Sequence, residues 1–141
     1  DKSAIRQYLT VVHGVLKDDE GTINAPIGRH PLHREKMGVV DDGKRAVSHY
    51  KVLERFKNFT YVEMTLETGR THQIRVHMTY AGHPLLGDSV YGPKKQPFNL
   101  KGQVLHARVL GFNHPVTGRY MEFESPLPDY FEKLLERCRN I

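Results

Sequence analysis

The sequence has one cysteine, Cys138, and no tryptophan among its 141 residues. A single cysteine excludes an internal disulfide and a cysteine-rich zinc site, so a reducing, cytoplasmic setting is expected. The sequence also lacks an apolar run of the roughly 18 residues that a membrane span requires. Its first residues, D-K-S-A-I-R, lack the apolar segment of a signal peptide. We therefore expect a soluble protein with no membrane partner.

Acidic residues are scarce in one part of the chain. Overall, 21 Lys and Arg stand against 16 Asp and Glu, which gives a net charge of +5. Positions 69–108 alone carry that whole excess, because one acid, Asp88, stands against six basic residues: Arg70, Arg75, Lys94, Lys95, Lys101 and Arg108. Such a concentration favours a polyanion as partner, RNA first. The alternative is an ordinary basic surface, since this net charge is common in soluble proteins.

Hydrophobic periodicity predicts five strands and two helices. The strands are expected at residues 5–12, 47–56, 60–67, 104–112 and 120–124, and the helices at residues 71–81 and from Pro128 onward. The strands at 47–56 and 60–67 should form a hairpin with one buried face. Residues 18–21 and 28–36 should be loops, the second of them exposed and basic. The chain is long enough for roughly one domain, and we predict an α+β fold: a mostly antiparallel sheet with two helices packed on it.

The first predicted helix carries an arginine, Arg75, at the border of its apolar stripe. Ile74, Met78 and Ala81 form its apolar stripe, Thr71 is a candidate N-cap and Gly82 a candidate end. A rotation of about 100° per residue places Arg75 on the border of that stripe, so its side chain should be half buried. A half-buried guanidinium needs an anion, either a carboxylate from elsewhere in the fold or a phosphate. A purely structural salt bridge is the alternative to a catalytic role.

Nine histidines raise the question of a metal site. His72 and His77 are five residues apart, about 140° around a helix, and cannot share a metal as histidines four apart do. His30 and His33 have no cysteine nearby and do not form a metal-binding pattern. We therefore expect no metal, and interpret these histidines as hydrogen-bond donors to phosphate or stacking partners for bases. A metal-dependent phosphodiesterase stays the least favoured alternative.

Two motifs resemble the RNA pseudouridine synthases of the RluA type. They are R-T-H-Q-I-R-V-H at 70–77 and G-H-P-L-L-G-D-S-V-Y-G at 82–92. The likeness continues in I-R-Q-Y-L-T-V-V-H-G near the start, in G-T-I-N-A-P-I-G-R-H-P and A-V-S-H-Y-K-V-L, and in L-H-A-R and H-P-V-T-G-R-Y-M-E-F-E-S-P-L-P near the end. It covers nearly the whole chain and is strongest toward the branch that modifies large-subunit ribosomal RNA.

The resemblance implies a cofactor-free isomerisation of uridine to pseudouridine in RNA. The uridine is flipped out, its base is detached from the sugar, and the base is rejoined through carbon. By matching motifs, Arg75 would pair with the nucleophilic Asp of the family and keep it ionised, and Tyr8 would stack on the flipped base and assist proton removal. Residues implied to contact RNA or shape the cleft are Arg29, His30, Arg70, His72, Gln73 and His77.

The family's Asp segment has no counterpart in this sequence. In the family it precedes the strand that holds Tyr8, whereas this sequence begins at Asp1, which does not match that segment, and Asp88 belongs to a different motif. We therefore expect residues 1–141 to be the carboxy-terminal portion of one synthase catalytic domain, truncated at its amino terminus and inactive alone. The alternative is a non-catalytic RNA-binding domain.

Overall fold

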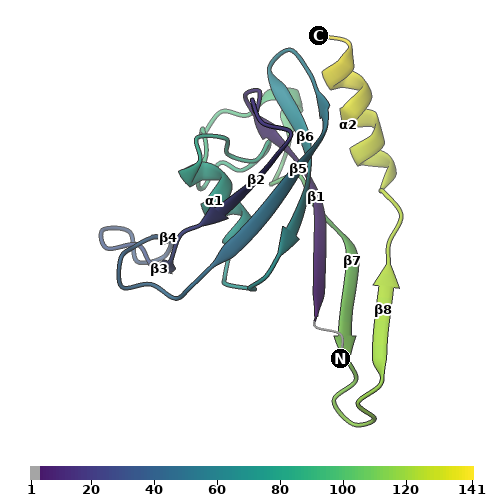
Figure 1. Cartoon of the computed structure of the whole chain (residues 1–141). Helices are drawn as coiled ribbons and strands as arrows, with labels where there is room; N and C mark the ends of the chain where they lie inside the picture. The colour runs from purple at the N-terminus through teal and green to yellow at the C-terminus, as the bar shows by residue number, and fades with distance from the viewer. Residues whose placement is uncertain (1–3) are drawn as a thin grey trace.

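A computed structural model describes residues 4–141 of the chain, so Asp1 lies outside the described residues. The main feature is one six-stranded antiparallel sheet in the order β2-β5-β6-β1-β7-β8 (Figure 1). Its strands are β1 (Ile5–His13), β2 (Glu20–Asn24), β5 (Val47–Arg55), β6 (Phe59–Leu66), β7 (Leu105–Asn113) and β8 (Tyr120–Glu124). A separate two-stranded ribbon pairs β3 (Ile27–Arg29) with β4 (Met37–Val39). The predicted α+β class is confirmed, and all five predicted strands are present.

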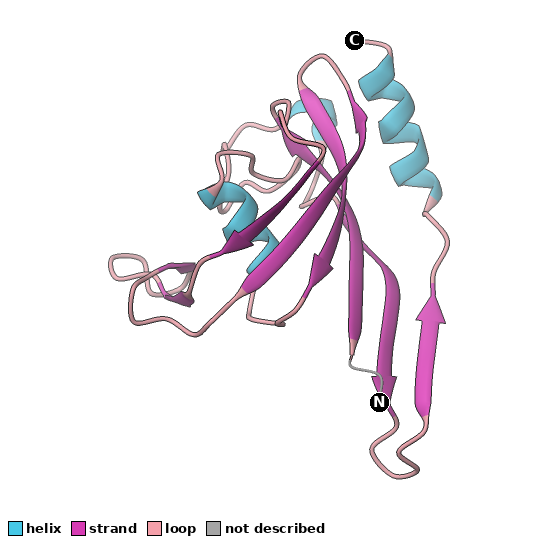
Figure 2. Cartoon of the chain, in the orientation of Figure 1, coloured by secondary structure: helices cyan, strands magenta, loops and turns pink. Residues whose placement is uncertain are grey.

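The helices cover opposite faces of the sheet, as Figure 2 shows. Helix α1 (Gln73–Tyr80) packs on one face and α2 (Asp129–Arg139) on the other, and a short 3-10 turn, η1 (Pro97–Asn99), lies in the loop after α1. The amphipathic stripe predicted for the second helix is confirmed, because Phe131, Leu134, Leu135 and Cys138 are all buried. None of the helices in residues 4–141 is long and apolar enough to cross a membrane.

Strand alternation explains how both faces are buried. Successive side chains of a strand point to opposite faces of the sheet. In β6, Val62 and Met64 therefore join the core under α1, while Tyr61 packs against the core under α2, its ring 5.7 Å from that of Phe131. The expectation of one buried face in this hairpin was therefore incomplete, because α2 returns to cover the second face.

The central strand β1 carries Tyr8, one of the two residues predicted to be catalytic. It pairs with β6 on one side and β7 on the other, and the β7 register shifts between Gln7 and Tyr8. Such an irregularity bends a strand and redirects its side chains. Tyr8 lies on the α1 face, partly buried against the core there.

Helix α1 begins differently from the prediction. Its N-cap is His72, not Thr71, and the His72 backbone is left-handed, with φ 56° and ψ 25°. This conformation is uncommon for a residue other than glycine. The predicted end at Gly82 fits the structure, since that glycine also has a positive φ, 88°.

The two segments expected to be loops are partly strands. β2 begins at Glu20, inside the segment 18–21, and pairs with β5. The basic segment 28–36 forms the tip of the β3–β4 ribbon rather than an isolated loop, although most of it is exposed as predicted. Periodicity does not predict these strands, because three residues in β3 and β4, and five in β2, carry too little of it to be distinguished from a turn.

Candidate functional site

A cavity of about 410 Å³ opens between β1 and the start of α1. It brings together Tyr8 and Arg75, which are far apart in the sequence and were both predicted to be catalytic. The other side chains and backbone atoms that line it belong to Arg6, Leu66, Gly69, Arg70, His72, Gln73, Ile74, Gln103 and Leu105. Three arginines and no carboxylate are among these lining residues. The cavity therefore suits a ligand or a protein group that carries negative charge.

Arg75 forms a two-point ion pair within the cavity wall. Its Nε donates to Asp88 Oδ2 at 2.9 Å and its Nη2 donates to Asp88 Oδ1 at 3.1 Å. The Arg75 side chain is 12% exposed and that of Asp88 is fully buried. The half-buried position predicted for Arg75 is thus observed. The carboxylate that it holds here is Asp88, from elsewhere in the fold as the spacing allowed, whereas the resemblance implied pairing with the nucleophilic Asp of the family.

Asp88 is held as an anion by several donors. Burial alone would raise its pKa, but the Arg75 side chain and the backbone N–H groups of Tyr91 and Val90 together hold the pKa below its ordinary value. Gly87, directly before Asp88, has a φ of 81°, and a Cβ at this position would overlap the Gly102 carbonyl. The turn that leads into Asp88 therefore requires glycine. All described contacts of the Asp88 carboxylate are thus internal, and they hold the Arg75 side chain in place.

Tyr91 joins Arg75 to His72. The Arg75 guanidinium carbon lies 4.9 Å from the centre of the Tyr91 ring, in cation–π contact. The Tyr91 hydroxyl accepts a hydrogen bond from the Met37 backbone N–H at 3.0 Å and lies 2.7 Å from His72 Nδ1. Burial first, and the Arg75 charge second, lower the pKa of His72. If neutral His72 accepts a hydrogen bond from the Tyr91 hydroxyl at Nδ1, its ring proton is on Nε2, which is then a hydrogen-bond donor.

Gln73 and His77 are both buried, which corrects the RNA-binding role predicted for His77. His77 is fully buried, with Nε2 at 2.9 Å from the Ala25 carbonyl and Nδ1 at 2.8 Å from Ser48 Oγ. The Gln73 amide donates to Ser48 Oγ and to the Val47 carbonyl. Direct contact of His77 with RNA is incompatible with this burial, whereas Gln73, although only 3% exposed, borders the cavity that contains Tyr8. Both side chains fix α1 to β5, and burial lowers the pKa of His77 despite its bond to Ala25.

The remaining predicted RNA-binding residues lie around the outside of the same region. Arg70 lines the cavity beside Arg75, and its Nε donates to the Arg45 carbonyl at 2.7 Å. A neighbouring cavity of about 440 Å³ is lined by Arg70 as well and also by Arg29. His30 lies on the β3–β4 ribbon, farther along this surface. The structure thus brings Arg29, His30 and Arg70 to neighbouring cavities on one side of the molecule.

Asp88 and Tyr91 are the functional candidates that the sequence did not assign. Their spacing in G-D-S-V-Y-G carried a signal, because an Asp side chain commonly accepts the N–H groups two and three residues ahead in a turn. Nothing in the spacing shows that this turn meets Arg75. Within residues 4–141, no group of three or more His, Cys, Asp or Glu side chains is arranged to hold a metal ion.

Comparison with known proteins gives consistent matches. Residues 1–80 match the family model described as RNA pseudouridylate synthase. The chain is 58% identical to an uncharacterized RNA pseudouridine synthase, YlyB, of Bacillus subtilis (strain 168), over 99% of this chain and 46% of that protein. It is 50% identical to ribosomal large subunit pseudouridine synthase D of Pseudomonas aeruginosa, over 98% of this chain and 47% of that protein.

A solved structure agrees with these sequence matches. Human RNA Pseudouridylate Synthase Domain Containing 1 superposes with a TM-score of 0.76 at 25% identity, over 98% of this chain and 66% of that one. The chain spans about half the length of the curated relatives it matches.

Proposed function

Since the chain belongs to the RNA pseudouridylate synthase family, we propose that the protein isomerises uridine to pseudouridine in RNA, and that the cavity between β1 and α1 receives the target uridine. One observation carries this proposal: Tyr8 and Arg75 line the same cavity. The surrounding arginines supply the positive charge that a phosphate-bearing nucleotide needs. The isomerisation that the family resemblance implies uses no cofactor.

We assign separate roles to the two side chains. Tyr8 stacks on the flipped uracil and assists removal of the proton that leaves carbon 5 when the new carbon–carbon bond to the sugar forms. Arg75 binds Asp88 through Nε and Nη2. Its Nη1 does not take part in that ion pair, and through this nitrogen Arg75 faces the nucleophilic carboxylate. A nearby guanidinium favours the ionised form of such a carboxylate, which is the form that attacks the sugar.

The nucleophile itself is proposed to come from the family segment that precedes the strand of Tyr8. Asp88 is unsuited to the role, because it is buried and its oxygens already accept four hydrogen bonds. The relatives are about twice as long as this chain, which leaves room for the family's Asp segment in the complete protein. Residues 1–141 alone are accordingly expected to be inactive, as the carboxy-terminal portion of the catalytic domain.

Large-subunit ribosomal RNA is the proposed substrate. Two relatives, from Pseudomonas aeruginosa and Nitrosomonas europaea, are named ribosomal large subunit pseudouridine synthase D and are 50% and 49% identical to this chain. Modification of ribosomal RNA is a cytoplasmic process in bacteria, and the single free Cys138 suits that reducing compartment.

The test compares residues 1–141 with a longer polypeptide that adds the family's Asp segment. Pseudouridine in large-subunit ribosomal RNA is measured by mass spectrometry of nucleosides. The longer polypeptide is expected to be active, its Arg75→Met variant inactive, and its Lys133→Met variant, altered on the other face of the sheet, fully active. Activity in the Arg75→Met variant would remove the role assigned to Arg75. RNA binding without turnover in the longer polypeptide would favour the alternative, a non-catalytic RNA-binding domain.

A further inference from the structure

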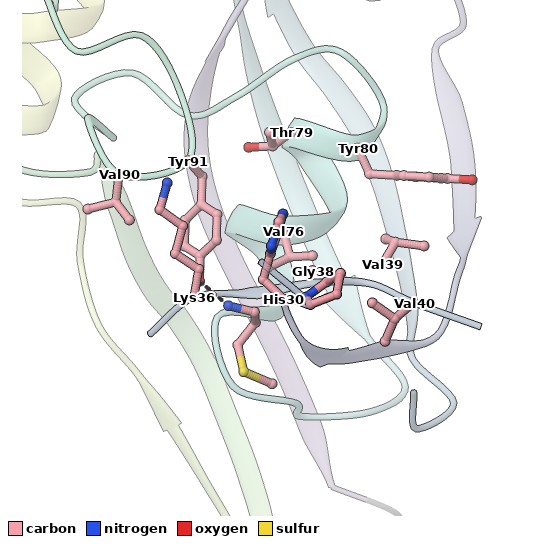
Figure 3. Close-up of a pocket in the computed structure, with 12 residues that line it drawn as sticks. His30, Lys36, Gly38, Val39, Val40, Val76, Thr79, Tyr80, Val90 and Tyr91 are labelled. Carbon is pink, nitrogen blue, oxygen red and sulfur yellow. Dashed lines mark hydrogen bonds between the residues drawn. The ribbon is translucent and has the colours of Figure 1, made fainter. Parts of the chain in front are cut away.

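A second groove lies on the far side of α1 from the start of β1. It has a volume of about 370 Å³ and runs between α1 and the β3–β4 ribbon (Figure 3). The ribbon contributes His30, Lys36 and Val39, and the helix contributes Thr79 and Tyr80. None of the roles proposed above for catalysis uses this groove.

The lining has the chemistry of a nucleobase site. Val39, Val40 and Val76 give the groove an apolar surface, and Tyr80 stands at its rim with 63% of its surface exposed. An exposed aromatic ring beside an apolar surface is a stacking platform for a base. Thr79 also lines the groove, and its buried Oγ1 has no hydrogen-bond partner within residues 4–141.

Two basic side chains complete the groove. Lys36 lies along its edge beside Tyr91 and Val90 in Figure 3. His30 Nδ1 accepts hydrogen bonds from the backbone N–H groups of Leu32 and His33, both at 3.1 Å. A neutral His30 therefore carries its proton on Nε2, where it serves as a donor.

The groove belongs to a continuous basic surface. The cavity that holds Tyr8 shares Gly69 and Arg70 with the neighbouring cavity of about 440 Å³. That neighbouring cavity in turn shares Met37 with the groove. Together these three are lined by one carboxylate, Asp42, and by six cations: Arg6, Arg29, Lys36, Lys44, Arg70 and Arg75. Another cavity, by contrast, is lined by two glutamates and one lysine. Charge thus favours a polyanion along this surface over a neutral or acidic peptide.

Tyr91 separates the groove from the cavity that holds Tyr8. Its ring lines the groove, while the same ring contacts the Arg75 guanidinium and its hydroxyl reaches His72. A ligand in the groove would therefore touch the residue that positions two side chains of the proposed active site.

From these contacts we infer that the groove binds the base of a second unpaired nucleotide in the RNA that carries the target uridine. Tyr80 stacks on that base, His30 donates a hydrogen bond to its polar edge, and Lys36 contacts a neighbouring phosphate. The RNA backbone follows Arg70 and Arg29 from one site to the other. The inference rests on the proposed function only in taking RNA as the ligand.

The experiment measures binding of a fluorescent oligouridylate and of an abasic ribose-phosphate oligomer of equal length. Tyr80→Ala should weaken binding of oligouridylate by at least roughly fivefold and leave the abasic oligomer unchanged, because stacking requires a base. Lys36→Gln should weaken both oligomers to a similar extent. The matched controls on α2, Tyr130→Ala and Lys133→Gln, replace exposed residues of the same types and should change neither.

The outcomes separate the two proposals. If Arg70→Gln weakens oligouridylate binding and Tyr80→Ala does not, the groove is not a base site, although RNA binding at the proposed active site stands. An equal loss for both oligomers in Tyr80→Ala would also overturn the inference, since it would show a contact with the backbone alone. If wild type binds neither oligomer, the proposed RNA ligand itself fails, and the groove proposal with it.

Discussion

Arg75 and Asp88 face each other through two parallel hydrogen bonds, 2.9 and 3.1 Å long, at the edge of the cavity that also contains Tyr8. The pair links helix α1 to the loop that follows it. Tyr91, three residues after Asp88, lies against the same guanidinium. Arg75 is thus held from two sides, and this leaves its third side available to the cavity. Because the Arg75 side chain is already fixed, it loses little further conformational entropy when a second anion binds to it.

Replacing Asp88 by Asn should destabilise the fold strongly. The variant leaves the mostly buried Arg75 without its counter-charge, and breaking a buried pair from one side costs about 3–5 kcal/mol. The measurement is the free energy of unfolding from urea titration. Glu54→Gln is the control and should cause a much smaller loss, because the Glu54–Arg139 ion pair is more exposed than the Arg75–Asp88 pair. Similar losses in the two variants would contradict a special role for the buried pair.

The contribution of Asp88 should disappear in acid. Its pKa in the folded state lies below the ordinary value of 3.8, so it binds a proton less readily when folded than when unfolded. The stability it supplies is therefore present above about pH 4 and is lost as the pH falls through the lowered pKa. The stability difference between wild type and Asp88→Asn should narrow below pH 4. A constant difference down to the acid transition would refute this.

His77 should make the fold more stable at neutral than at mildly acidic pH. Burial lowers its pKa from 6.5, so the folded state resists protonation while the unfolded state accepts it. Stability contributed by neutral His77 is complete above the unfolded pKa and falls as the pH drops below it. Urea titrations between about pH 7 and pH 5 measure the slope. His77→Gln should be less stable at neutral pH and show a shallower slope; an unchanged slope would exclude His77 as its source.

The sequence predicts the burial of a side chain correctly where that burial depends on a single helix. The stripe of α2 follows from helical spacing alone, and the half-buried position of Arg75 follows from its angle on α1. Spacing could not reveal that Gln73 and His77 lie inward, because that depends on Ser48 in β5 and on Ala25 in the link between β2 and β3. The predicted RNA contact of these residues rests on the resemblance, which matches residue types along the motif and does not show which way each side chain points.

The same limit explains the missed partner of Arg75. Its angle on the helix showed that an anion was needed, but the identity of the anion depends on how the loop after α1 folds back. Gly87 and the turn around Asp88 determine that path through contacts with Gly102, far along the chain. Likewise, no local pattern predicted the left-handed His72, which is stabilised by its contact with Tyr91.

Truncating Phe131 should test whether α2 is an integral part of the fold. This side chain is fully buried between α2 and the sheet, where it contacts Tyr61. Phe131→Ala removes that contact and leaves a cavity, so the free energy of unfolding should fall by about 3–5 kcal/mol. Its neighbour Tyr130 is 52% exposed, and Tyr130→Ala should change stability by only about 0.5 kcal/mol. Equal effects would mean that α2 does not pack as the structure has it.

Removing the charge of Arg70 should change how RNA binding responds to salt. Arg70 lines two of the basic cavities, and its Nε is held by the Arg45 carbonyl, which leaves its other nitrogens for a phosphate. Each phosphate contact releases condensed counterions, so the logarithm of affinity falls with the logarithm of salt concentration in proportion to the number of contacts. Arg70→Gln should therefore reduce the magnitude of that slope by about 1. Lys133→Gln, on the opposite face, should leave it unchanged, and an identical slope in all three proteins would show that Arg70 makes no phosphate contact.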